Sequence, residues 1–291
     1  MTKFTVIGGC GSSDLAKRIS RKLKARYIKT EKKVFPDGES KITINQIPKK
    51  SIVVVVQSTY PPVDSNLLEL LSIVSKVQKF SSKIYAVIPY MGYARQDREF
   101  LGGEIITIGV VGKLLKASGV KKVLTVDIHS KLALKELKIS SENVSAIDEL
   151  VKHFKKINMK NPLVVSPDLG GQARAKKFAS LLKMDSIALK KHRDRKTGKV
   201  KILSEKVDVK DRDLIIVDDM ISTGGSIVKA TQFLKKQKCK RIFVACTHAL
   251  LVNNAAKNIK DAGVSQIIST NTIPGDSAKV DVSKVISDAL K

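Results

Sequence analysis

A chain of 291 residues, of which 43% are hydrophobic, is long enough for two domains that each bury a sizeable core. It has no run of about eighteen uncharged apolar residues, and its three cysteines lack C-x-x-C spacing, so we expect no membrane span, disulfide framework or zinc site. The net charge of +27 suits polyanionic substrates, but lysines are spread through most predicted helices and aromatics are scarce, so nucleic acid is not expected as the main partner.

The chain begins with a short predicted strand, Phe4–Ile7, and no signal-peptide apolar region precedes it. Together with the odd cysteine count, this predicts a cytoplasmic location. A glycine-rich turn, residues 8–13, then leads into a helical pattern that runs from Leu15 to about Lys24. Taken alone, such a G-G-x-G turn is weak support for a phosphate site.

Residues 34–44 predict a β-hairpin. Pro36-Asp37-Gly38 is a good turn signal, and the alternation from Lys41 to Ile44 is typical of a strand. On the residues alone, this segment is an ordinary hairpin tip.

The string Arg95-Gln96-Asp97-Arg98 follows a predicted strand at Ile84–Ile88. The preceding elements are a strand at Ile52–Gln57 and a helix with apolar positions from Leu67 to Val77. Two arginines that bracket Gln-Asp are compatible with a surface salt bridge, which contributes little stability. They are equally compatible with a clamp for the phosphates of a triphosphate, which planar guanidinium groups suit well. The family resemblance described below favours the clamp.

An amphipathic helix is predicted at Glu104–Lys116, with its apolar stripe through Ile105, Ile108, Val111 and Leu115. The next strand, Val123–Val126, ends in Asp127-Ile128-His129. Strand alternation would place Asp127 and His129 on one face of the strand end. A lone histidine there is more often structural than a ligand.

The second half of the chain begins after Lys155–Pro162, a segment rich in lysine and asparagine that is the candidate boundary. A predicted strand at Leu163–Val165 leads to Asp168, a Gly-Gly turn and a helix. Asp168 suits either a helix N-cap or a metal ligand. After a strand at Ile187–Leu189, the highly charged residues 190–199 are typical of a solvated loop.

The chain is organised around Leu214–Ile227, sequence LIIVDDMISTGGSI. Its apolar start predicts a strand buried on both faces, which the carboxylates of Asp218 and Asp219 end. The hydroxyl and glycine loop that follows precedes a helix, so its amides favour an anion. Two carboxylates next to an anion site can accept hydrogen bonds from the hydroxyls of a sugar that is attached to the anion. The predicted ligand is therefore a sugar phosphate. The alternative is a capped helix with solvated aspartates.

Strands at Arg241–Cys246 and Ile267–Thr270 and a helix near Val282–Leu290 complete the chain. Both halves show parallel-strand patterning with crossover helices, which implies right-handed βαβ units. The predicted fold class is therefore α/β, with two domains that each carry a mainly parallel sheet flanked by helices. The predicted domains are residues 1–147 and 148–275, followed by a terminal segment, residues 276–291, that can pack on either.

Six strings occur in the order and spacing of one known family: FPDGE, YARQDR, D-I-H, SPDLGGQARA, K-H-R and VDDMISTGGS. On these strings nearly the whole chain resembles the ribose-phosphate diphosphokinases (PRPP synthetases), as an archaeal-type member of the type I phosphoribosyltransferase-like superfamily. The resemblance implies two tandem phosphoribosyltransferase-like domains. It also implies transfer of the β,γ-diphosphoryl group of Mg-ATP to the 1-hydroxyl of ribose 5-phosphate. The products are PRPP and AMP, for nucleotide biosynthesis.

The resemblance assigns roles to matching residues. It implies ATP binding by Phe35, Asp37, Gly38, Glu39, Arg95, Gln96 and Asp97, and ribose 5-phosphate binding by Asp218, Asp219, Ser222, Thr223, Gly224, Gly225 and Ser226. It implies Mg²⁺ as the cofactor, held by His129 and Asp168 with Asp127 in support. Lys191 and Arg193 match a catalytic K-x-R pair on an arm that closes over the transferring group, and Lys190 is an alternative register. The implied assembly is a homo-oligomer built from dimers, in which the FPDGE loop reaches a neighbouring subunit's ATP site.

The chain departs from the family pattern at a few positions. Ser222 stands where many relatives have Asp, Ser226 where many have Thr, and His192 replaces the middle residue of the bacterial K-R-R form. Two rival functions remain. A salvage phosphoribosyltransferase uses the same loop in a single domain, and FPDGE, YARQDR and the second half-chain argue against it. A noncatalytic regulatory relative or repressor should have lost the Lys-Arg arm or the metal ligands, for which candidates are present here.

Overall fold

The computed structural model of the chain describes residues 3–48, 51–193, 200–202 and 207–291. It divides into two units. Unit 1 comprises Met1–Ser145, Asn271–Pro274 and Asp281–Lys291, and unit 2 comprises Ala146–Thr270 and Gly275–Val280. The division falls between residues 145 and 146, whereas the sequence placed it between 147 and 148. Across the described ranges, no helix has the length and apolarity needed to cross a membrane.

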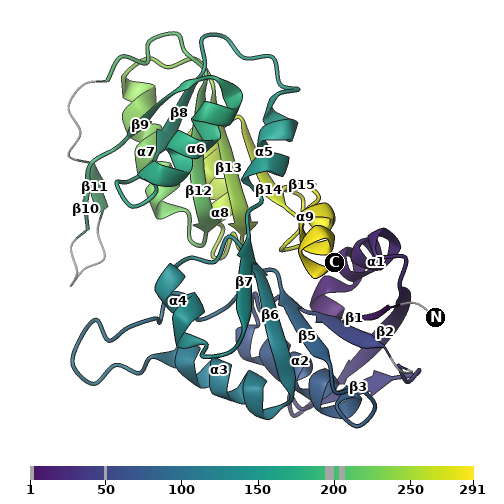
Figure 1. Cartoon of the computed structure of the whole chain (residues 1–291). Helices are drawn as coiled ribbons and strands as arrows, with labels where there is room; N and C mark the ends of the chain where they lie inside the picture. Colours follow the sequence, from purple (N-terminus) through teal and green to yellow (C-terminus); the bar gives the residue numbers. More distant parts are fainter. Residues whose placement is uncertain (1–2, 49–50, 194–199, 203–206) are drawn as a thin grey trace. The chain divides into compact units, whose positions relative to one another are not determined.

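Unit 1 is built on a seven-stranded sheet in the order β3-β2-β1-β4-β5-β6-β7 (Figure 1). Every neighbouring pair is parallel except β2 and β3, which form the predicted antiparallel hairpin. The strands are β1 Phe4–Gly8, β2 Arg26–Val34, β3 Ser40–Ile44, β4 Ile52–Val56, β5 Ile84–Ile88, β6 Val120–Val126 and β7 Ser141–Val144. The helical elements are η1 Cys10–Ser12, α1 Ser13–Lys22, α2 Val63–Val77, α3 Thr107–Ala117, α4 Lys131–Glu136 and α9 Ser283–Leu290.

The core of unit 1 follows from two sequence patterns. β4 is a run of β-branched residues whose last four are fully buried, as expected for a parallel strand covered on both faces. α2 presents Leu70, Ile73, Val74 and Val77 on one face at helical spacing, and all four join the same buried cluster as β4.

α3 begins three residues later than predicted, because the Glu104 carboxylate accepts the Phe100 amide at 2.9 Å and closes a turn instead of opening the helix. Ile105 therefore lies outside the apolar stripe and is 69% exposed, while Ile108, Val111 and Leu115 are buried as predicted.

The C-terminal helix α9 belongs to unit 1, where it lies against α1 (Figure 1). Asp281 anchors its start by accepting the Ser283 amide at 2.9 Å and by lying 3.4 Å from Arg18 of α1. The sequence had left the packing of this helix open.

Unit 2 has a six-stranded, fully parallel sheet in the order β15-β14-β13-β12-β8-β9. The strands are β8 Leu163–Ser166, β9 Asp185–Ala188, β12 Leu214–Ile221, β13 Ile242–Ala249, β14 Gln266–Thr270 and β15 Ala278–Val280. The helices are α5 Ile147–Phe154, α6 Gln172–Leu182, α7 Gly225–Lys236 and α8 Ala255–Asp261. A separate antiparallel pair joins β10 Lys191–Arg193 to β11 Val200–Ile202.

The sheet of unit 2 is covered on both faces. One core joins it to α7 and α8, and the other joins it to α5 and α6. The segment Lys155–Pro162 lies inside this unit, because Asp213 accepts the Lys160 amide at 2.6 Å and Arg241 donates to the Asn158 carbonyl at 2.8 Å. It is therefore not the boundary that its composition suggested.

Candidate active site

The clearest ligand cradle in unit 2 lies between β12 and α7. Two main-chain carbonyls of this segment accept hydrogen bonds from the residues that follow β13. Ile221 O accepts the amides of Leu250 and Leu251, and Ser222 O accepts that of Val252. The amides of Thr223 and Gly224 have no acceptor in the described part of the chain; Thr223 and Gly225 are exposed, and Gly224 between them is buried. Main-chain amides that are not hydrogen-bonded at a helix N-terminus favour an anion such as phosphate.

Glycine is required at one position of this cradle. Gly224 has φ +75°, and a Cβ there would lie 2.8 Å from Ile259 Cδ1, so both backbone conformation and space exclude a side chain. A Cβ at Gly225 would meet no atom within 4 Å, so this residue faces open space.

Asp218 and Asp219 lie within β12 and do not end it, which corrects the prediction that the acids stop the strand. The ladder to β13 continues past them through Met220 and Ile221. Main-chain pairing with β13, which like β12 has eight residues, thus carries the strand through residues whose side chains interrupt the apolar run.

The two acids share a cation that the sequence analysis did not identify as a site residue. Arg174 Nη1 of α6 lies 3.3 Å from Asp218 Oδ1 and 3.5 Å from Asp219 Oδ1. Burial and the charge of Asp219 raise the pKa of Asp218 well above its ordinary value, and Arg174 opposes this rise. Arg174 belongs to the SPDLGGQARA string and lies in the first helical turn after Gly170-Gly171. This position is the sequence feature that could have identified it as a site residue.

Asp168 lies at the same edge of the sheet as the twin acids, because β8 and β12 are parallel neighbours. It follows the end of β8, and its charge contributes to raising the pKa of Asp218. Its Oδ1 accepts the Gly171 amide at 2.9 Å, so it closes the turn that opens α6. Asp168 can close this turn and also bind a metal ion, because a carboxylate has lone pairs besides the one that accepts the Gly171 amide.

In unit 1, the loop after β5 is held by an ion pair. Arg98 donates to both oxygens of Asp97, at 2.9 and 3.0 Å, and Asp97 is buried. The Arg98 hydrogen bond, together with one from Ser130, lowers the pKa of Asp97 from 3.8 to about 2. Of the two arginines predicted as a clamp, Arg98 is thus committed to Asp97, whereas Arg95 and Gln96 are exposed.

The loop after β6 starts at the same sheet edge, because β5 and β6 are parallel neighbours. Asp127 has φ +38°, so strand alternation stops at Val126 and does not place Asp127 and His129 on one strand face as predicted. His129 is exposed and Asp127 is half-buried.

The predicted hairpin tip, residues 35–39, joins β2 to β3. Phe35 donates its amide to Glu39 O at 2.8 Å, and Gly38, at φ +92°, donates its amide to Phe35 O at 2.9 Å. Asp37 Oδ1 accepts the Glu39 amide at 3.0 Å, so one carboxylate oxygen is used within the turn. Phe35 is 36% exposed, and Lys33 Nζ lies 5.3 Å from the centroid of its ring.

The catalytic candidates Lys191 and Arg193 lie in β10, where their backbones pair with Ile202 and Val200 of β11. Residues 194–199, between these strands, lie outside the described residues, as do residues 203–206. Lys190 directly precedes β10 and is exposed.

The glycine turn after β1 is not an anion site. Its first helical amide, that of Cys10, donates to Glu69 Oε1 at 2.6 Å, and Glu69 is fully buried. A carboxylate from the protein itself occupies the position that an anion would take, and burial followed by hydrogen bonding to Glu69 raises the pKa of the Cys10 thiol.

Within the residues whose placement the structure gives, no three His, Cys, Asp or Glu side chains cluster as a metal site would require.

The sequence matches two family models, described as the N-terminal domain of ribose phosphate pyrophosphokinase over residues 4–119 and the phosphoribosyl transferase domain over residues 133–281. The chain is 38% identical to the ribose-phosphate pyrophosphokinase of Sulfolobus acidocaldarius over 289 residues, which cover 97% of this chain and 98% of the relative. It is 35% identical to that of Methanobrevibacter smithii, over 98% and 99% of the two chains, and 39% identical to that of Pasteurella multocida, over 94% and 88%. The crystal structure of phosphoribosylpyrophosphate synthetase from Mycobacterium smegmatis matches with a TM-score of 0.85 at 25% identity, over 99% of this chain and 97% of that one. These matches confirm the predicted fold class.

Proposed function

The chain belongs to the ribose-phosphate pyrophosphokinase family, and from this premise we propose how its residues carry out the family's reaction. The enzyme transfers the β,γ-diphosphoryl group of ATP to the 1-hydroxyl of ribose 5-phosphate and releases AMP, which supplies PRPP for nucleotide biosynthesis. One observation carries the assignment of the sugar site: the amides of Thr223 and Gly224 at the N-terminus of α7 have no acceptor among the described residues.

Ribose 5-phosphate binds at the end of β12. Its phosphate lies on Ser222, Thr223, Gly224, Gly225 and Ser226, where the amides of Thr223 and Gly224, which lack an acceptor among the described residues, and the helix N-terminus favour a dianion. The 2- and 3-hydroxyls donate to Asp218 and Asp219. Arg174 holds both carboxylates in place and offsets part of their mutual repulsion.

ATP is held by two loops that both belong to unit 1, the loop after β5 of one subunit and the tip, residues 35–39, of a neighbouring subunit. The purine stacks on the exposed face of Phe35, its amino group donates to Asp37 and Glu39, and Gly38 gives the tip its turn. Arg95 and Gln96 are exposed at the carboxyl edge of the sheet and contact the phosphates. Asp97 contributes through its ion pair with Arg98, which shapes this loop.

Mg²⁺ accompanies the ATP phosphates, with His129 and Asp168 as the protein ligands and Asp127 in support of His129. When bound, it neutralises part of the charge on the phosphates. Asp168 offers the hard oxygen donor that this ion prefers, while one of its oxygens already accepts the Gly171 amide.

The transfer step is an attack of the anomeric hydroxyl on the β-phosphorus, with AMP as the leaving group. No residue here is assigned as a general base, since phosphoryl-type transfer depends mostly on positioning and charge stabilisation. Lys191 and Arg193 supply positive charge around the transferring group, with Lys190 as the alternative register. A cytoplasmic location and a homo-oligomer in which the tip, residues 35–39, reaches a neighbouring subunit's ATP site complete the proposal.

Incubation with ATP, Mg²⁺ and ribose 5-phosphate, followed by ³¹P NMR, tests this function. We expect equal amounts of AMP and PRPP. ADP in place of AMP would indicate an ordinary kinase. No consumption of ATP, together with conversion of PRPP and a nucleobase to a nucleotide, would indicate the salvage phosphoribosyltransferase.

A further inference from the structure

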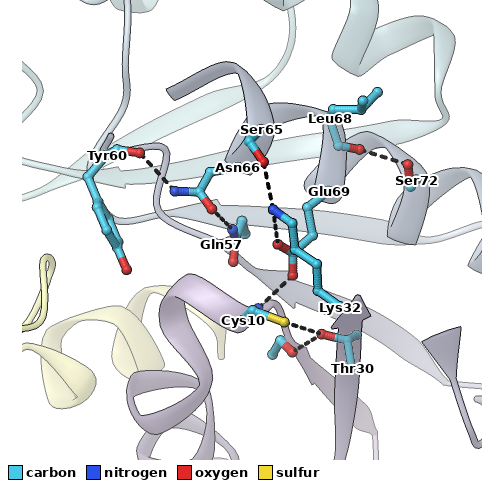
Figure 2. Close-up of polar contacts among 11 residues, drawn as sticks. Cys10, Thr30, Lys32, Gln57, Tyr60, Ser65, Asn66, Leu68, Glu69 and Ser72 are labelled. Atoms are coloured by element: carbon cyan, nitrogen blue, oxygen red, sulfur yellow. Dashed lines mark hydrogen bonds and ion pairs between the residues drawn. The ribbon is translucent and has the colours of Figure 1, made fainter. Parts of the chain in front are cut away.

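A buried ion pair lies beneath the β2–β3 hairpin in unit 1 (Figure 2). Glu69 of α2 has no exposed surface, and its Oε2 lies 3.5 Å from Lys32 Nζ of β2. Lys32, with 14% of its side chain exposed, also donates to Ser65 Oγ at 2.7 Å. A carboxylate is costly to bury, and the ion pair with Lys32 offsets part of this cost at Glu69 Oε2, which accepts no hydrogen bond from the described residues.

The outer part of the hairpin extends past the strand that anchors its base. β1 ends at Gly8, whose partner in β2 is Lys29. From Thr30 onward β2 pairs only with β3 among the described strands, and β3 is the edge of the sheet. The tip, residues 35–39, is therefore carried by a two-stranded ribbon, a unit that is at best marginally stable by itself.

Two side chains of β2, those of Thr30 and Lys32, make polar contacts between this ribbon and the rest of unit 1. Thr30 Oγ1 donates to Gly8 O at 2.8 Å near the base, and Lys32 reaches α2 two residues further on. Ile42 and Ile44 of β3 add partly buried apolar contacts with the core. Of these two side chains, Lys32 lies nearer the tip, three residues before Phe35. Its charge-assisted hydrogen bond to Ser65 fixes the direction of the ribbon better than apolar contacts do.

We propose that the Lys32–Glu69 pair positions the hairpin tip for ATP binding. Through Cys10, whose amide Glu69 also accepts, the pair fixes the hairpin to the turn that follows β1 as well as to α2. Both are positioning residues that act through the hairpin. The inference rests on the proposed role of residues 35–39 in holding the purine.

The test compares Lys32→Met with Lys29→Met, which makes the same change at an exposed position of the same strand. We expect Lys32→Met to raise the KM for ATP about tenfold, the equivalent of one charge-assisted hydrogen bond, and to leave the KM for ribose 5-phosphate unchanged. Lys29→Met should leave both constants unchanged, and Lys32→Arg, which keeps the charge, should restore most of the ATP affinity.

Lys32→Met leaves the buried Glu69 carboxylate without its ion-pair partner and can therefore destabilise unit 1 as a whole. The double variant Lys32→Met/Glu69→Gln removes both charges and keeps an acceptor for the Cys10 amide, so it separates positioning from stability. We expect its KM for ATP to be raised as well. A double variant with a lower Tm but a wild-type KM for ATP would show that the pair only stabilises the fold, and would overturn the inference.

Phe35→Ala separates this inference from the proposed function. If Phe35→Ala raises the KM for ATP and the double variant does not, only the positioning role is wrong. If Phe35→Ala also leaves that KM unchanged, the tip does not bind ATP, and both the loop assignment and the positioning role are wrong.

Discussion

Arg174 Nη1 of α6 lies 3.3 Å from Asp218 Oδ1 of β12, across 44 positions of sequence. The same nitrogen lies 3.5 Å from Asp219. Burial and the charge of Asp219 raise the pKa of Asp218, and the arginine works against that rise. A cation from helix α6 therefore holds the paired acids of strand β12 in position to accept hydrogen bonds from sugar hydroxyls.

Replacing Arg174 with glutamine should weaken ribose 5-phosphate binding. Without the cation, the pKa of Asp218 rises further and a proton competes with the sugar hydroxyl. We expect the KM for ribose 5-phosphate to rise about tenfold and the defect to grow as the pH is lowered. Steady-state kinetics across pH, with the exposed Arg21→Gln of α1 as the control, measures this. An unchanged KM at every pH would exclude Arg174 from the sugar site.

Gly224→Ala should destabilise unit 2 and disturb the phosphate cradle. Alanine at φ +75° is strained, and its Cβ would press on Ile259, so we expect a loss of about 1–3 kcal/mol in the free energy of unfolding. Gly225→Ala is the matched control, since its Cβ meets only open space. Urea denaturation of both variants gives the comparison, and equal stabilities would contradict the strain argument.

The sequence predicts the site better where the signal is local than where it depends on tertiary contacts. The buried run that starts β12 and the glycine loop after it follow from the residues themselves. The continuation of β12 through Asp218 and Asp219 does not, because it depends on the ladder to β13.

Arg174 and Glu69 show the same limit. A guanidinium 44 positions from its carboxylate, or a glutamate 37 residues from its lysine, becomes visible only when helices pack on sheets. At Asp127, a single left-handed backbone conformation ended an alternation that the sequence would have continued.

The ion pair at Asp97 should make the stability of unit 1 depend on pH. The folded pKa of Asp97, about 2, lies below its ordinary value of 3.8, so the contribution is full above about pH 4 and is lost as the pH falls toward 2. Because Arg98 is half exposed, we expect Arg98→Met to cost only about 1 kcal/mol at pH 7. Denaturation of this variant and of Arg95→Met at pH 7 and pH 2.5 checks it. A loss that stays constant between the two pH values would contradict the linkage.

Lys191→Ala should lower turnover at least about a hundredfold while ATP binding changes little, because the lysine is proposed to act on charge that develops in the transition state. Lys190→Ala is the matched variant, since the two lysines are adjacent and represent the two registers of the family's K-x-R pair. Single-turnover rates together with ATP binding measured by calorimetry separate the effects. Near-normal turnover in Lys191→Ala would remove it from the catalytic pair, and a large loss in Lys190→Ala would select the other register.

Amide NMR during a ribose 5-phosphate titration tests the central claim most directly, because it reports on the individual N–H groups of the cradle. We predict that the largest shift changes fall on residues 222–226, with Thr223 and Gly224 foremost, and that they saturate together with those of Asp218 and Asp219. Saturable binding that leaves these amides unmoved and shifts another part of the chain would contradict the assignment of this loop as the sugar-phosphate site.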